Sequence, residues 1–257
     1  MNEQNYPLLE DLHVLRTATL VSIRDRAFDS LPLYYENYSD GIVSGCRLKT
    51  SRDTISLLPG IVRYGGFMYF LREVMQVRYM PTEEYCLLKL KFSMPEDSEN
   101  FRKRCVTMEL SPDMIVKDDE IELARFKLKA GSVLRTKYVD FFDRVTEFDT
   151  INSVYCPYAA IGRSTVAPEI VSSFAKEASA YNLEPLDLTF CLAALSKMPL
   201  SYEQISFYLQ QKLSVPGEDW DNMGLYNGLC TVLRQIQNGG EREIRRMNNR
   251  RREVFVD

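Results

Sequence analysis

The chain has 257 residues, of which 45% are hydrophobic and 26% charged, and its formal net charge is −4 at pH 7. This ordinary globular composition excludes a wholly disordered chain, and the length allows one large domain or two smaller ones. The net charge is too small to indicate a partner. No apolar run approaches the roughly 18 residues that a membrane helix needs, so we expect no membrane contact.

The motifs of the common enzyme classes are missing. The sequence has no GxxxxGKS/T phosphate loop, no GxGxxG after a strand and no GxSxG elbow. His13 is the only histidine, and the six cysteines lie at wide spacings that suit buried, reduced thiols better than a zinc site. We therefore predict no enzyme activity, no cofactor and no metal. We interpret the acidic cluster of Asp140, Asp143, Glu147 and Asp149 as a solvated connector rather than a glycosidase pair.

Residues 1–30 carry apolar side chains at roughly helical spacing, which predicts one helix or two short ones. The triplet Arg24–Arg26 is typical of a solvated helix face. Such a helix would pack on the open side of the domain that follows, or pair with a copy of itself. The segment has no basic stretch followed by an apolar one, so we expect no secretory signal.

A link rich in tyrosine follows at Leu31–Tyr38. It either covers an edge of the next domain or offers a contact surface, because tyrosine is enriched at protein interfaces. Its candidate partner contacts are Tyr34, Tyr35 and Tyr38.

Residues 40–92 alternate short β-type runs with glycine punctuation. The expected turn positions are Gly41, Gly45, Pro59, Gly60, Gly65 and Gly66. The runs between them are β-branched and aromatic, which suits a pleated, half-buried surface. Tyr64–Phe67 is the strongest local pattern, because two apolar runs separated by Gly-Gly predict a tight hairpin with a primed turn.

Alternating runs continue at Cys105–Leu110 and Ile121–Leu128. The second run breaks its alternation near Ala124, which indicates a bulge or an imperfect period. Several short strands joined by short turns, with no long helix between them, predict an antiparallel β-sandwich or small barrel over 31–150. A break in pattern indicates a linker at 151–164.

The hydrophobic period becomes helical from Thr165 onward and predicts a small helical bundle over 165–240. We expect its four helices to begin near Ala167, Pro185, Ser201 and Asn222. Pro216–Gly217 and Gly239–Gly240 would end the last two helices, and we assign the apolar residues to the core. The fold class is therefore α+β: an N-terminal helical segment, an antiparallel β-domain and a small C-terminal helical bundle.

The C-terminal tail, 241–257, is basic. Its candidate partner contacts are Arg245, Arg246, Arg250, Arg251, Arg252 and Phe255. An arginine run can bind phosphate backbones. Glutamates dilute this run and no aromatic residue is interleaved before Phe255, so we favour an acidic protein partner over nucleic acid. The apolar tip would add as a strand to a neighbouring sheet.

The stretch from Asp40 to Phe92 resembles a known family. DGIVSGC, an apolar strand, LPGIV and GGFMYFL together are similar to a small β-module of phage tail, baseplate and tail-fibre proteins. The resemblance covers roughly a fifth of the chain. The segment Thr82–Leu90 departs from the aspartate-rich strand that ends the commoner fibre form.

The resemblance implies a structural component of a phage tail or contractile-particle baseplate, joining the baseplate to a neighbouring tail or fibre protein. Its partners would be other tail, baseplate or fibre proteins, and we expect a homo-oligomer in the particle. The protein would then reside in a virion or particle tail that is assembled in the bacterial cytoplasm.

Two alternatives stay open. The first is a carbohydrate- or receptor-binding module in which Tyr64, Tyr69 and Tyr79 stack on sugars. The second is a nucleic-acid-associated protein that acts through the arginine run of the tail.

Overall fold

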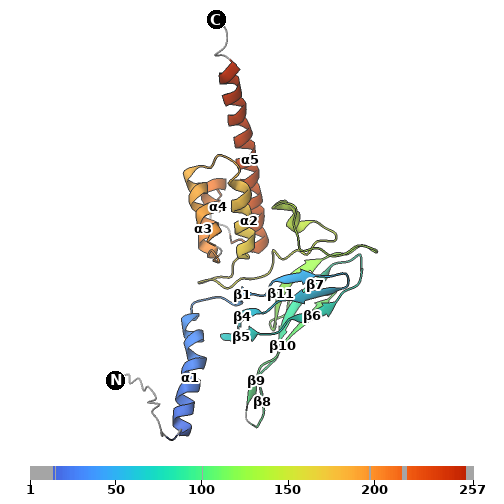
Figure 1. Ribbon diagram of the computed structural model, residues 1–257, viewed down its shortest axis with the longest axis vertical. Helices are drawn as coiled ribbons and strands as arrows, with labels where there is room; N and C mark the ends of the chain where they lie inside the picture. The colour runs from blue at the N-terminus through green and yellow to red at the C-terminus, as the bar shows by residue number, and fades with distance from the viewer. Residues whose placement is uncertain (1–13, 15, 100, 197, 216–218, 253–257) are drawn as a thin grey trace, which may run out of the picture.

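The computed structural model describes residues 14, 16–99, 101–196, 198–215 and 219–252, with the backbone alone described at 102 and 240–252. The fold is α+β, as predicted. It comprises an N-terminal helix, three small antiparallel sheets and four C-terminal helices (Figure 1). None of the described helices is both long and apolar enough to span a membrane.

The strands form three small antiparallel sheets and a separate two-stranded hairpin. The first sheet has the order β1-β4-β5, with β1 (Gly41–Gly45), β4 (Gly60–Tyr64) and β5 (Phe67–Leu71). The second contains β2 (Leu48–Thr50), β3 (Thr54–Leu57) and β6 (Met75–Arg78). The third contains β10 (Val106–Ser111), β7 (Cys86–Phe92) and β11 (Glu120–Phe126). The hairpin pairs β8 (Glu96–Asp97) with β9 (Arg102–Lys103).

Local chemistry explains the strand pairing. Gly65 and Gly66 form the two-residue turn between β4 and β5, with φ of 56° and 78°. Both angles match the primed turn that twists with its strands, so the predicted hairpin is confirmed. The expected break near Ala124 is a bulge, because the register of β11 against β7 shifts between Glu122 and Ala124.

The C-terminal part contains α2 (Pro168–Ala178), α3 (Pro185–Leu195), α4 (Tyr202–Leu213) and α5 (Asn222–Arg252). α4 begins with a capping box, in which the Ser201 hydroxyl accepts from the Gln204 amide and the Gln204 side chain accepts from the Ser201 amide. The predicted end of the last helix at Gly239–Gly240 is wrong, since α5 continues to Arg252. A glycine costs a helix only about 1 kcal/mol, so a pair of them weakens a helix without forbidding it.

The N-terminal helix α1 (Thr17–Tyr34) ends four residues later than the predicted helical segment, 1–30. It absorbs the first part of the predicted tyrosine link, and Pro32 lies in its last turn. The segment before Val14 lies outside the described residues.

One hydrophobic core spans the sheets and the helices. Phe141, from the connector after β11, contacts Phe174 of α2 and Tyr226 of α5 at ring-centroid distances of 5.8 and 5.1 Å. The buried Tyr226 hydroxyl donates to the Phe141 carbonyl at 2.7 Å. Residues 151–164 also join the body, with isolated β-bridges from Tyr158 to Ile42 and from Ile161 to Tyr38.

The corner between β1 and β4 requires two glycines at close quarters. A Cβ on Gly60 would lie 2.4 Å from the Cys46 nitrogen and 2.5 Å from the Ser44 carbonyl oxygen. A Cβ on Gly45 would lie 2.4 Å from the Pro59 oxygen. Since these neighbours are backbone atoms, they cannot move aside without shifting both strands.

We expect Gly60→Ala to destabilise the protein by about 1–3 kcal/mol, because it forces an extra methyl group into backbone contact. Gly65→Asn is the matched control. At Gly65 the φ angle is positive, but no atom lies within 4 Å of where a Cβ would be, and asparagine is accepted at this turn position. Urea unfolding followed by circular dichroism measures both, and equal free energies of unfolding for the two variants would contradict the expectation.

Candidate interaction surfaces

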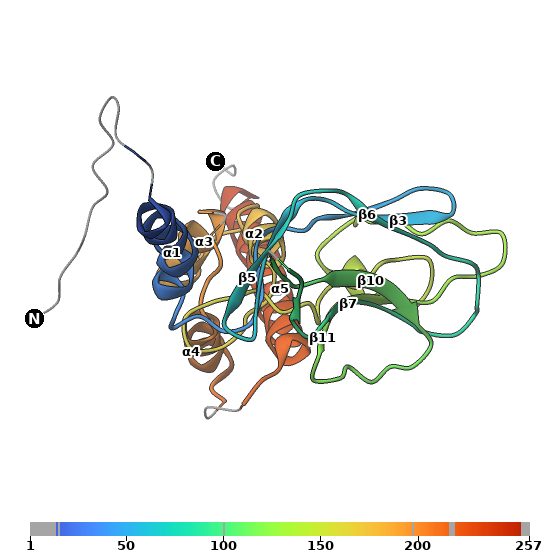
Figure 2. The same cartoon turned by 90° about the horizontal axis from the view of Figure 1, so that it is seen from below.

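α1 presents apolar side chains to solvent. None of its residues is buried, and Leu20, Phe28 and Leu33 are 53%, 74% and 67% exposed. Among the strands, the helix meets β5 (Figure 2). An isolated helix of this length gains most of its stability from packing its apolar side chains, so these exposed side chains are suited to a partner.

The predicted contact tyrosines lie at the end of α1 and just beyond it. Tyr34 is exposed, and its ring meets Tyr35 edge-on at 5.1 Å. Tyr35 in turn meets Tyr38 at 4.8 Å, and both of these are partly buried. Tyr34 is therefore the most accessible member of the cluster.

α3 carries a second exposed apolar stripe. Leu188, Leu192 and Leu195 follow one face of the helix and are exposed, whereas Phe190 and Ala194 face the core. The assignment of all its apolar residues to the core is therefore wrong. The sequence did hold a signal: an almost uniformly apolar helix has no polar face, so an outer position leaves leucines uncovered.

The basic tail is placed only in part. Arg245, Arg246 and Arg250–Arg252 belong to the last turns of α5, and their side chains lie outside the described residues. Phe255 lies outside them altogether. The far end of α5 and α1 occupy opposite ends of the long axis of the molecule (Figure 1).

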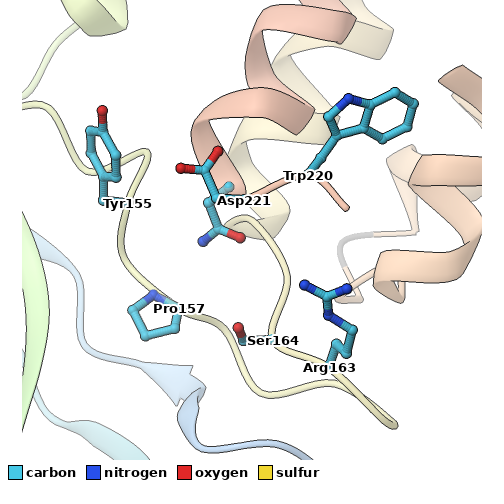
Figure 3. A pocket seen from close by; sticks show the side chains of 7 residues that line it. Tyr155, Pro157, Arg163, Ser164, Trp220 and Asp221 are labelled. Atoms are coloured by element: carbon cyan, nitrogen blue, oxygen red, sulfur yellow. The ribbon is translucent and has the colours of Figure 1, made fainter. Parts of the chain in front are cut away.

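A cavity of about 260 Å³ lies between the 155–164 connector and the start of α5 (Figure 3). Its lining residues are Tyr155, Pro157, Arg163, Ser164, Trp220, Asp221 and Asn222.

The polar groups of this cavity serve the fold. The Asn222 amide donates to the Cys156 and Thr165 carbonyls at 3.1 and 3.3 Å. The Asp221 carboxylate caps α5 by accepting from the Gly224 amide at 2.7 Å. This carboxylate occupies the helix N-terminus where an anion would otherwise bind.

Residues of the acidic connector form hydrogen bonds and ion pairs within the fold. The Arg135 guanidinium forms an ion pair with the Asp143 carboxylate, with Arg135 Nη2 2.6 Å from Asp143 Oδ1. Asp143 also accepts from the Val139 amide at 2.8 Å. Glu147 pairs with Lys127 at 2.9 Å. The interpretation of this cluster as merely solvated is therefore too simple.

The sugar-stacking alternative loses one of its tyrosines. Tyr79 is only 5% exposed, and its hydroxyl donates to the Ser51 carbonyl at 2.6 Å, so its predicted exposure is wrong. Tyr64 stacks on Phe92 at 4.0 Å and its hydroxyl donates to the Asp118 carbonyl. Tyr69 meets the same phenylalanine edge-on at 4.9 Å.

Within the described part of the chain, no three histidine, cysteine or acidic residues are grouped so that they could hold a metal ion. Cys46, Cys156, Cys191 and Cys230 are buried free thiols, and Cys105 is exposed. Burial raises the pKa of Cys46 to about 12, so this thiol stays protonated at neutral pH.

A buried carboxylate organises the helical part. Asp187 of α3 accepts from the Tyr208 hydroxyl of α4 at 2.8 Å and from Lys212 Nζ at 3.0 Å. Lys212 also reaches the exposed Glu184 at 2.9 Å. Burial raises the pKa of Tyr208, and the carboxylate raises it further, so the hydroxyl remains a donor.

We expect Asp187→Ala to cost about 3 kcal/mol, because it leaves the buried Tyr208 hydroxyl without its acceptor and Lys212 with only the exposed Glu184. Glu184→Gln removes the exposed partner of the same lysine and should cost about 1 kcal/mol at most. Urea unfolding of both variants checks this. A similar loss of unfolding free energy in both would show that the buried carboxylate contributes no more than the exposed one.

The Asp143 pair predicts a pH dependence. Hydrogen bonding to Arg135 lowers the pKa of Asp143 well below its ordinary value of about 3.9. Because the folded pKa is depressed, its contribution is fully present above the ordinary pKa and is lost as the pH falls below it. Asp143→Asn should therefore be less stable at pH 7 and lose less stability on acidification. Thermal melts from pH 7 to pH 3 test this, and parallel pH profiles for both proteins would refute it.

A scan against protein-family models found no match, and a search of curated proteins likewise found none. Two solved structures are similar in the arrangement of their elements. A crystal structure of TssK has a TM-score of 0.42 at 9% identity, over 92% of this chain and 69% of that one. A chain of the type VI secretion system TssK-TssF-TssG baseplate subcomplex has a TM-score of 0.42 at 11% identity, over 91% of this chain and 99% of that one.

Proposed function

We propose that the chain is a non-enzymatic structural component of a phage tail or contractile-particle baseplate, which joins the baseplate to a neighbouring tail or fibre protein. The observation that carries the proposal is the set of exposed apolar side chains on α1, a helix with no buried residue. The resemblance of residues 40–92 to a β-module of tail proteins supports the same role.

The exposed apolar side chains of α1 and of α3 would each bind a different partner. α1 and the β-sheets would hold one neighbour, while the leucine stripe of α3, with the basic tail, would dock a second. The partners are other tail, baseplate or fibre proteins, and the assembled particle would contain several copies of the chain. The protein would be assembled in the bacterial cytoplasm and reside in the particle tail.

A pull-down with point variants of the full chain tests this role. The tagged protein is expressed with the products of its neighbouring genes, and the bound proteins are identified by mass spectrometry. Phe28→Glu charges the face of α1, and Leu192→Glu charges the stripe of α3. Ser30→Glu and Thr189→Glu add the same charge at exposed positions of the same helices and serve as controls.

We expect the wild-type protein to recover tail, baseplate or fibre proteins, and each apolar-to-glutamate variant to lose one of them at least tenfold, because a buried charge at such a contact is costly. The control variants should keep both partners. Recovery of no such protein by the wild type would overturn the proposal, as would recovery of nucleic acid alone.

A further inference from the structure

Two arginines lie among the exposed apolar side chains at the start and in the middle of α1. Arg16, which precedes the helix as its N-cap, is followed at intervals of four residues by Leu20, Arg24 and Phe28. Residues four apart are neighbours on one side of a helix, so these four form a single ridge, here called the arginine–leucine ridge. All four are exposed, and the ridge contains no acidic residue.

The arginine–leucine ridge points away from the body of the molecule. The partly covered residues in the first three turns of α1 are Thr19, Ser22 and Asp25. Successive residues of an α-helix are turned by about 100°, so this partly covered set lies on the opposite side of α1 from the ridge. The ridge is therefore the side of the helix that is open to another protein.

The two arginines have little to hold them within their own chain. Arg24 Nη2 lies 2.6 Å from Asp25 Oδ1, and the two side chains are 61% and 49% exposed. An exposed pair of this kind contributes little stability, so Arg24 can exchange this carboxylate for one on another protein at little cost. The Arg16 side chain forms no ion pair with any residue that the structure describes.

The start of α1 adds to the positive charge of the ridge. The first turn holds no acidic residue, and no side chain caps it. The partial positive charge of the helix N-terminus therefore lies beside Arg16 without a compensating anion. A carboxylate brought to this end of the ridge would interact favourably with both the guanidinium and the helix terminus.

We propose that the arginine–leucine ridge binds an amphipathic helix of a partner protein in which aspartate or glutamate alternates with apolar residues. A carboxylate would then face each arginine, while apolar side chains pack on Leu20 and Phe28. Such charge complementarity selects the partner and sets its register more than it adds raw affinity. The inference rests on the proposed function, because it specifies the chemistry of the partner that α1 binds.

Other occupants fit the ridge less well. A second copy of α1 would bring arginines against arginines, and like charges across an interface act against pairing. An anionic lipid surface attracts helices with a strongly basic face. The helix Thr17–Tyr34 contains two arginines and two aspartates, so its side chains carry no net charge that would draw it to such a surface.

The affinity of Arg24 variants measures the contribution of the charge. The protein that Phe28→Glu loses in the pull-down is purified, and its Kd for the full chain is measured by calorimetry. We expect Arg24→Glu and Arg24→Leu each to weaken binding about tenfold or more, because both leave the partner's carboxylate without its cation. Arg24→Lys keeps the charge and should stay within a few-fold of the wild type. Arg52→Glu, an equal charge change in an exposed loop, is the control.

A purely apolar contact predicts the opposite result for Arg24→Leu. Unchanged or tighter binding by that variant would overturn the inference, while the loss with Phe28→Glu, and with it the proposed function, would stand. A wild type that recovers no partner would overturn both. Circular dichroism confirms that each variant folds.

Two further measurements test the other occupants directly. Light scattering after size exclusion would reveal a dimer, and sedimentation with phosphatidylglycerol vesicles would reveal lipid binding. We expect neither for the wild-type chain. Either one, if abolished by Phe28→Glu, would assign the ridge to a second copy or to a lipid surface and overturn the inference.

Discussion

The contact between Phe141 and Tyr226 holds the two halves of the chain together. The Tyr226 side chain is fully buried, and its hydroxyl would be costly to leave without an acceptor, so the hydrogen bond to the Phe141 carbonyl fixes where α5 meets the connector. The Phe174 ring packs edge-on against the Phe141 ring, which joins α2 to the same contact. The sheets and the helices α2–α5 thus share one core, and the exposed face of α3 is held at a set position on it.

The charged groups that are buried in this core form ion pairs or hydrogen bonds with other residues. Lys89 of β7 is buried and donates to Glu120 of β11 at 2.8 Å. Burial alone would raise the pKa of Glu120, but the hydrogen bonds from Lys89 and from the Lys117 amide outweigh it and lower the pKa. Among the helices, Asp187 is likewise a buried carboxylate that accepts hydrogen bonds, from Tyr208 and Lys212. Such pairs contribute register and orientation more than net stability.

The sequence allowed the fold class, the Gly65–Gly66 hairpin and the bulge near Ala124 to be predicted, because turn chemistry and strand alternation are local signals. The sequence did not allow the division into three sheets to be predicted, since strand order depends on pairings between residues far apart in the chain. Burial was harder still. Tyr79 directly follows β6 and Leu192 lies in α3, and only the tertiary packing decides that the first is buried and the second is exposed.

The long return of the connector to the first sheet has a consequence for folding in the cell. The Ala160 amide donates to the Ser39 hydroxyl across 121 residues, and Tyr226 reaches Phe141 across 85. Contacts between such distant residues form late, because loop closure must precede them. During synthesis the β-strands therefore leave the ribosome before α5 does, and their core stays incomplete until α5 is made. Over that interval its apolar strands are exposed to chaperones and to other nascent chains.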